Sequence, residues 1–144
     1  MKLQQLSLFL ENRPGTLQAP TRVLAGAGVN ILSVSLADTA QFGILRLIVA
    51  EPEWARQVLA DAGMVVRVSE VVAVEVEHEP GGLARALTAV EDAHLGVAYM
   101  YLFGGAPRQG AAALIFRFAE PDAAVEALTK AGVRVLSREE LIPG

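Results

Sequence analysis

The sequence predicts an α+β fold of two tandem β-α-β-β-α-β units, each with an antiparallel sheet and helices on one face. Three observations predict it. The chain repeats itself, both copies show the same order of strand-like and helix-like apolar periods, and turn residues separate these periods. A length of 144 residues allows two small domains. We therefore expect one unit at residues 1–69 and a second at 70–144.

The repeat consists of two ordered sets of matching residues. The segment NRPGTL at 12–17 aligns with HEPGGL at 78–83, with the two prolines 66 positions apart. Further along, EP at 51–52 matches EP at 120–121, 69 positions apart. The three additional residues of the second copy fall around 104–110, where a lengthened hairpin loop is expected.

In the first copy, Leu6, Leu8 and Leu10 alternate and predict a strand that ends at Pro14. Apolar residues at 17, 23, 24 and 27 predict a helix with Thr16 near its N-cap, because Pro20 is tolerated only in a first turn. The further elements expected are a strand at 32–36, a turn at 38–41, a strand at 44–50, a helix at 52–62 containing Trp54 and a strand at 65–68.

The second copy follows the same order, with strands at 71–77, 97–103, 111–118 and 133–136 and helices at 82–93 and 121–131. Ser137 and Glu140 form a capping-box pattern that predicts a short last helix. This succession of elements is the split βαβ, or ferredoxin-like, unit.

Alternation along the strands assigns side chains to the two faces of each sheet. Leu32, Val34 and Leu36 are expected to face the helices. The repeat offset puts Tyr99 and Tyr101 on the opposite face, which would also carry Ile115 and Phe103. Such an apolar face needs a cover, because large exposed apolar patches are rare on monomers. The other copy or a second chain would supply it, and we expect a homodimer.

Composition excludes several classes of protein. Apolar residues make up 53% and charged residues 19%, which excludes a disordered chain. No apolar run approaches 18 residues, so no membrane span or membrane partner is expected. The start of the chain lacks a signal-peptide pattern, and a cytoplasmic protein is expected. A net charge of −4 without a polybasic segment argues against nucleic acid as a partner.

No catalytic site is predicted. Cysteine is absent, and the sequence contains no H-E-x-x-H, G-x-S-x-G or EF-hand motif. His78 and His94 lie in unrelated settings with no evident carboxylate partner, and are interpreted as surface or loop histidines. We therefore expect no enzyme, no metal and no cofactor.

The turn from Glu11 to Leu17 is the most informative stretch. Proline fixes φ, glycine permits a close backbone approach, and the following helix start offers unpaired N–H groups with a partial positive charge. A small carboxylate suits that place, and the Asn12 amide could hold an α-amino or α-carboxylate group. Asn30 opens the second strand and is expected near this turn, where it would complete a clamp. From the local residues alone, a plain strand-to-helix turn without a ligand remains an alternative, with Asn30 capping a helix C-terminus.

The segments ENRPGTL at 11–17 and LAGAGVNI at 24–31 resemble the ACT domain, a βαββαβ amino-acid sensor of regulated metabolic enzymes. The turn is most similar to the serine-sensing ACT domain of phosphoglycerate dehydrogenase. The duplicated chain, with FGILR at 42–46, resembles stand-alone tandem ACT proteins of bacteria. In that family, amino acids bind between two ACT units whose sheets often join side by side.

The resemblance implies a set of ligand-binding residues and a function. The set is Leu10, Asn12, Arg13, Pro14, Gly15, Thr16, Leu17, Asn30 and Ile31, with Tyr99, Met100 and Tyr101 of the second copy as possible pocket walls. Leu10 stands where the serine sensor has histidine, which suggests a different side-chain pocket. The expected function is a non-catalytic allosteric sensor that binds a small amino acid at an ACT–ACT interface. The alternative is a structural interaction protein that docks a metabolic enzyme or transporter without a ligand.

Overall fold

The computed structural model describes residues 1–11, 13–38 and 42–142. Contacts divide the chain into two compact units. One consists of Gln4–Ser69 and is called the N-terminal repeat below. The other combines Met1–Leu3 with Glu70–Gly144 and is called the C-terminal repeat. No helix in the described part of the chain is both long enough and apolar enough to span a membrane.

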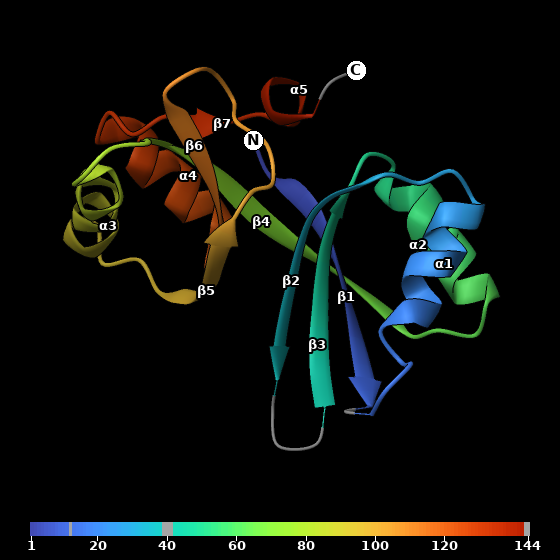
Figure 1. Cartoon of the computed structure of the whole chain (residues 1–144). Coiled ribbons are helices and arrows are strands. Elements are labelled where there is room, and N and C mark those ends of the chain that lie inside the picture. The colour runs from blue at the N-terminus through green and yellow to red at the C-terminus, as the bar shows by residue number, and fades with distance from the viewer. Residues whose placement is uncertain (12, 39–41, 143–144) are drawn as a thin grey trace. The chain divides into compact units, whose positions relative to one another are not determined.

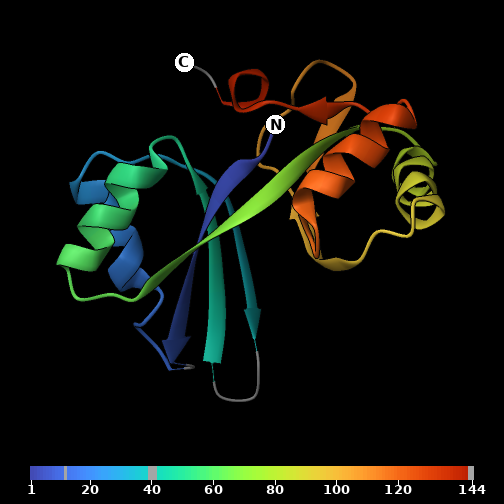
Figure 2. The same ribbon diagram turned by 180° about the vertical axis from the view of Figure 1, so that it is seen from behind.

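The N-terminal repeat contains the expected β-α-β-β-α-β succession (Figure 1). Its elements are β1 (Leu3–Glu11), α1 (Gln18–Gly26), β2 (Ile31–Asp38), β3 (Phe42–Val49), α2 (Pro52–Asp61) and the first residues of β4 (Val66–Glu77). The strand order is β2-β3-β1-β4, and the two helices contact each other on one face of the sheet (Figures 1 and 2).

The C-terminal repeat has the same succession and the same strand order. The remainder of β4 is followed by α3 (Gly82–Asp92), β5 (Val97–Leu102), β6 (Ala111–Phe118), α4 (Pro121–Lys130), β7 (Val135–Leu136) and α5 (Arg138–Leu141). Its order β7-β4-β6-β5 corresponds element by element to that of the N-terminal repeat. The strands expected separately at 65–68 and 71–77 are one continuous strand. The fold class predicted from the sequence is confirmed.

The register of the N-terminal sheet fixes which strand ends lie together. β1 and β2 are both antiparallel to β3, with Glu11 opposite Phe42 and Asp38 opposite Gly43. Strands that are antiparallel to a shared neighbour are parallel to each other. The end of β1 therefore lies level with the end of β2, and not with its beginning.

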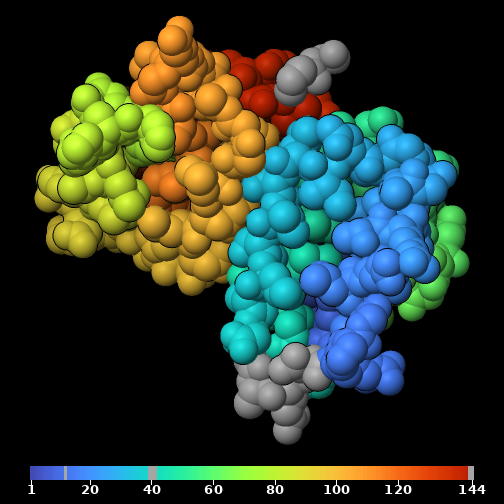
Figure 3. All heavy atoms as spheres, in the orientation of Figure 1, coloured from blue at the N-terminus to red at the C-terminus, as the bar shows by residue number. Residues whose placement is uncertain are grey.

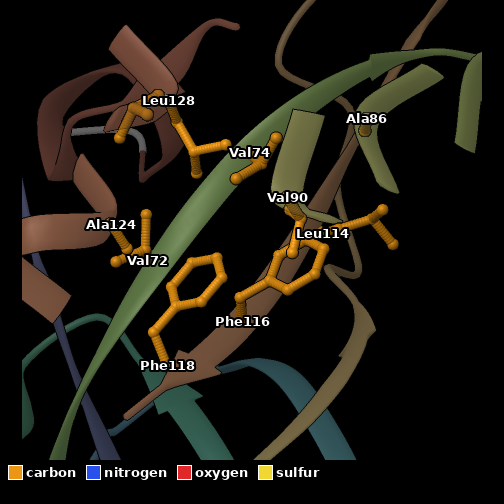
Figure 4. Packing of buried hydrophobic residues seen from close by; sticks show 10 residues of the cluster. Val72, Val74, Ala86, Val90, Leu114, Phe116, Phe118, Ala124 and Leu128 are labelled. Carbon is orange, nitrogen blue, oxygen red and sulfur yellow. The ribbon is translucent and has the colours of Figure 1, made fainter. Parts of the chain in front are cut away.

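Each repeat has its own apolar core between the sheet and its helices. In the N-terminal repeat, Leu6, Leu8, Leu45 and Leu47 of the strands pack with Leu24, Ala55 and Leu59 of the helices. The C-terminal core is built around Phe116 and Phe118, whose rings stack with their centroids 5.1 Å apart (Figure 4). Burial of such side chains contributes about 1.5–3 kcal/mol each, which is how two small units obtain cores.

Three positions show local detail that the sequence pattern does not give. Thr16 precedes the N-cap of α1, which is Leu17, and the helix begins at Gln18, so Pro20 falls in the first turn as expected. A register irregularity between Ile31 and Ser33 makes Ile31, and not Leu32, pack against the core. Trp54 is 48% exposed on α2, where its indole N–H donates to the Ala27 carbonyl at 3.2 Å.

Other local predictions are confirmed. Ser137 caps α5 in a capping box: its hydroxyl accepts from the Glu140 amide, and the Glu140 carboxylate accepts from the Ser137 amide. The longer connection at 103–110 joins the antiparallel hairpin of β5 and β6. Most of the turn expected at 38–41 lies outside the described residues.

Candidate functional site

The turn between β1 and α1 is held by hydrogen bonds to its own backbone. The Arg13 amide donates to the Glu11 carbonyl at 2.8 Å. The Thr16 hydroxyl lies 2.7 Å from the same oxygen and 3.0 Å from the Arg13 carbonyl. Gly15 has a φ of 92°, in the left-handed region that only glycine adopts without strain. The turn is thus a preformed structure.

Helix α1 starts from this turn without a side-chain cap. Its N-cap, Leu17, makes no capping hydrogen bond, and the first turn contains no acidic residue. The first N–H groups of an α-helix lack intrahelical partners and carry about half a positive charge in total. The start of α1 can therefore accept a carboxylate.

Two pockets flank the turn. The first, called the turn pocket below, has a volume of about 450 Å³ and is lined by Leu10, Glu11, Arg13, Pro14, Gly15, Thr16, Leu17, Leu36, Asp38 and Gly43. The second, of about 590 Å³, shares the turn residues and adds Phe9, Ala19, Pro20, Gly63 and Met64. Both volumes lie in the range of small-molecule sites. β2, cyan in Figure 3, lies at the surface of this repeat.

Two of the three charged side chains in the described lining of the turn pocket pair with each other. The Arg13 Nε atom lies 3.0 Å from the Glu11 carboxylate, and both side chains are about two-thirds exposed. Gly43 leaves room for its neighbour, because a Cβ there would lie 3.2 Å from Leu36 Cδ1. The Leu36 side chain therefore lies across the backbone of Gly43 and forms a wall of the pocket.

Six of the residues expected to bind ligand line the turn pocket together: Leu10, Arg13, Pro14, Gly15, Thr16 and Leu17. Asn12 lies outside the described residues. The expectation that Asn30 lies near the turn is wrong within one repeat. Ile31 pairs with Val49, and the Ala50 amide donates to the Asn30 carbonyl. These contacts are about 23 Å along β3 from the Phe42 end, at 3.3 Å per residue.

Sequence reasoning missed Glu11, Leu36, Asp38 and Gly43 as lining residues. The signal was available in the predicted topology, because β1 and β2 are parallel in a ferredoxin-like unit. Their ends, and not their beginnings, had to lie beside the turn.

The corresponding turn of the C-terminal repeat is tighter. Gly81, with a φ of 86°, takes the place of Gly15. Gly82 takes the place of Thr16, and a Cβ there would lie 1.9 Å from the Glu77 carbonyl oxygen. The carbonyl thus occupies the space that a side chain would need.

Charged side chains line the cleft beside this second turn. Glu77, His78, Glu79, Arg108, Gln109 and Gly110 surround a pocket of about 360 Å³. Arg85 lies 2.9 Å from Glu77 and 3.0 Å from Glu79. A hydrogen bond with Glu79 and the charge of Arg85 lower the pKa of the Glu77 carboxyl.

A second group of charges lies on the same repeat. The guanidinium of Arg108 donates two hydrogen bonds to Glu75, whose side chain is only 7% exposed, and the carboxylate raises the pKa of Arg108. Arg134 contacts both Glu75 and Glu140. Within residues 1–11, 13–38 and 42–142, no group of three or more metal-ligating side chains could hold a metal ion.

Tyr99, Met100 and Tyr101 lie on β5 of the C-terminal repeat. The two tyrosine rings stack with centroids 6.4 Å apart and are half-buried. They pair with Arg117 and Ile115, on the sheet face opposite the helices, as expected. Their assignment as walls of a ligand pocket stays a prediction.

Comparison with known proteins identifies the type of domain. The family model described as "ACT domain pair" matches residues 1–143. No curated protein matches the chain.

Solved structures share the fold over most of its length. The chain is 33% identical to protein BT0572 from Bacteroides thetaiotaomicron, covering 100% of this chain and 98% of that one with a TM-score of 0.90. It is 15% identical to the ligand-free regulatory subunit of aspartate kinase from Thermus thermophilus, covering 90% and 92% with a TM-score of 0.60. Aspartate kinase from Clostridium acetobutylicum is 10% identical, with 90% and 32% covered and a TM-score of 0.51.

Proposed function

This chain belongs to the ACT domain pair family, and from that premise we propose that it is a non-catalytic regulatory protein that binds a small amino acid at the β1–α1 turn of its N-terminal repeat. The observation that carries the proposal is the turn pocket beside an uncapped helix start. The α-carboxylate would lie at the first amides of α1, and Asp38 would face the α-ammonium group.

The position of Asn30 suggests that a second copy completes this site. β2 is the edge strand of the N-terminal sheet, and Val34 and Leu36 on it are 57% and 54% exposed. A two-fold axis through Val34 would pair β2 with β2 of a second copy in antiparallel fashion. Asn30 of the second copy would then lie beside Asp38, which lines the turn pocket. In the homodimer, the second chain would supply the Asn30 amide, which within one chain lies far from the β1–α1 turn.

Calorimetric titration with each of the twenty amino acids tests the proposal. We expect saturable binding of at least one, and loss of that binding in Asn12→Ala and in Asn30→Ala. His78→Ala, at the position equivalent to Asn12 in the C-terminal repeat, is the matched control. Ligand at 100 times its Kd should stabilise the protein by about 2.7 kcal/mol. No heat at millimolar concentrations together with an unchanged Tm would refute the sensor.

Mixing variants tests whether Asn30 acts across the dimer. A heterodimer of Asn12→Ala and Asn30→Ala chains contains one site with both native asparagines. Equal mixing of the two inactive variants should therefore restore about a quarter of the sites. No restoration after subunit exchange would contradict the proposal that Asn30 acts across the dimer.

The exposed apolar side chains of β2 also favour the second candidate, an interaction protein that docks an enzyme or transporter without a ligand. The two functions differ in what the asparagines do. If Asn12→Ala combined with Asn30→Ala leaves capture of a partner unchanged and no amino acid binds, the docking function stands.

A further inference from the structure

The turn pocket has apolar walls on three sides. Leu10 is half-buried on β1, Leu17 is 42% exposed at the start of α1, and Leu36 is 54% exposed on β2. Gly43 forms part of the floor and lets Leu36 lie across it. Leucines that belong to three different elements thus converge on one cavity of about 450 Å³.

Most polar side chains of the described lining are already engaged with the turn itself. The Thr16 hydroxyl contacts the carbonyls of Glu11 and Arg13, and the Arg13 guanidinium is paired with Glu11. Asp38 is the remaining charged side chain of the lining. These polar groups suit the two charges at the ligand's Cα, whereas the leucines form apolar walls for a side chain.

The pocket described beside the turn of the C-terminal repeat has a different lining. Leu83 and Leu102 are the equivalents of Leu17 and Leu36, and they are similarly exposed, at 43% and 62%. Neither lines the cleft there, which is bounded by Glu77, His78, Glu79, Arg108, Gln109 and Gly110. The described pocket beside the C-terminal turn is therefore lined by polar and charged residues, unlike the turn pocket.

We infer that the turn pocket selects amino acids with aliphatic side chains. The inference rests on the proposed function and deepens it by naming the ligand class. The α-carboxylate lies at the start of α1, and the side chain packs among Leu10, Leu17 and Leu36. Apolar surface removed from water would then supply the selectivity.

A homologous series measures this contribution directly. Titration with alanine, α-aminobutyrate, norvaline and norleucine adds one methylene at a time to the same charged groups. Burial of a methylene contributes about 0.8 kcal/mol, so each step should strengthen binding about fourfold. Valine should bind at least about tenfold more tightly than its isostere threonine, because the walls cannot satisfy the hydroxyl.

Variants locate the effect in the pocket. Leu36→Ser should weaken norleucine binding about fivefold or more and reduce the gain per methylene in the series, because the lost wall contacts the longer side chains. Leu102→Ser, at the equivalent exposed position of the C-terminal repeat, should change neither the affinity for norleucine nor the gain per methylene. An unchanged far-UV spectrum and Tm in both variants shows that they fold.

The outcomes separate the two proposals. Saturable binding that depends on Asn12, with a flat homologous series or tighter binding of threonine, would overturn the aliphatic inference and leave the sensor standing. Equal loss in Leu36→Ser and Leu102→Ser would also overturn it. If none of these amino acids or the other natural ones binds, both proposals fail.

Discussion

Gly82→Ala should damage the C-terminal repeat more than a single methyl group usually does. Gly82 is the first residue of α3 and is buried. A Cβ on it would lie 1.9 Å from the Glu77 carbonyl oxygen and 3.0 Å from the Glu77 carbonyl carbon, where real Cβ contacts are not closer than 3.0 Å. Backbone must therefore move by about 1 Å to make room. No flexible side-chain end is involved that could turn away.

The loss in free energy of unfolding expected for Gly82→Ala follows from the need to move backbone and not a side chain. Overpacking of a well-packed region costs about 1–3 kcal/mol, and a clash between two backbone segments belongs at the upper end. We expect Gly82→Ala to lower the free energy of unfolding by about 3 kcal/mol. Thr16→Ala is the matched control in the N-terminal repeat. It removes a hydroxyl that hydrogen-bonds to the turn and should cost about 1 kcal/mol.

Denaturant unfolding with two probes assigns the cost to a repeat. Trp54 is the single tryptophan of the chain and lies in the N-terminal repeat, whereas far-UV circular dichroism reports on both repeats. In Gly82→Ala the dichroism midpoint should fall, and separate transitions would show loss of two-state behaviour. A loss in Gly82→Ala no greater than in Thr16→Ala would refute the argument that the Glu77 carbonyl closes this turn.

Three further predictions concern ionisable groups and a helix cap. Arg85→Ala should raise the pKa of Glu77, because it removes the positive charge that helps to hold this pKa low; carboxyl NMR titration measures this. The lowered pKa of Glu77 stabilises the fold above about pH 4.3, and this stabilisation is lost as pH falls through the folded-state pKa. Arg85→Ala should therefore weaken the acid dependence of stability. Ser137→Ala removes the cap of α5 and should cost about 1 kcal/mol in thermal or denaturant unfolding. Hydrogen bonds from Ser137 lower the pKa of Glu140, so Glu140→Gln should make stability less sensitive to acid below about pH 4.3, and an unchanged acid limb would contradict this.

The elements of this fold could be predicted because each has a recognisable pattern in its own stretch of sequence. Alternating leucines on β1, Pro52 at the start of α2 and the capping box at Ser137 each act through neighbours in sequence. The internal repeat then confirmed the order of elements, since every element of one copy had a counterpart in the other. Thr16 adjoins the N-cap without capping the helix, because its hydroxyl donates back to the Glu11 carbonyl and not forward to the helix.

Only those site residues that lie close together in the sequence could be predicted. Pro14, Gly15 and Leu17 were found because they belong to one turn. Leu36 and Asp38 join them through the register of β2 and β3, which depends on hydrogen bonds between segments distant in sequence. Asn30 was expected near the turn because the beginning of β2 was placed beside the end of β1 without following the direction of the strands. β1 and β2 are parallel and flank β3, so both begin at one end of the sheet and both finish at the other.

The two repeats show how one fold can be kept while its turn chemistry changes. Their cores use the same sheet-and-helix packing, and Gly15 and Gly81 share the same left-handed backbone. After that glycine, the N-terminal turn has Thr16 and adjoins leucines. The C-terminal turn has Gly82, which leaves room for the Glu77 carbonyl, and adjoins ion pairs. A substitution at an exposed turn position usually costs little, so the exposed residues beside these turns can differ between the repeats while the cores stay alike. If the proposed site is present in the N-terminal repeat alone, titration should give a stoichiometry of one amino acid per chain.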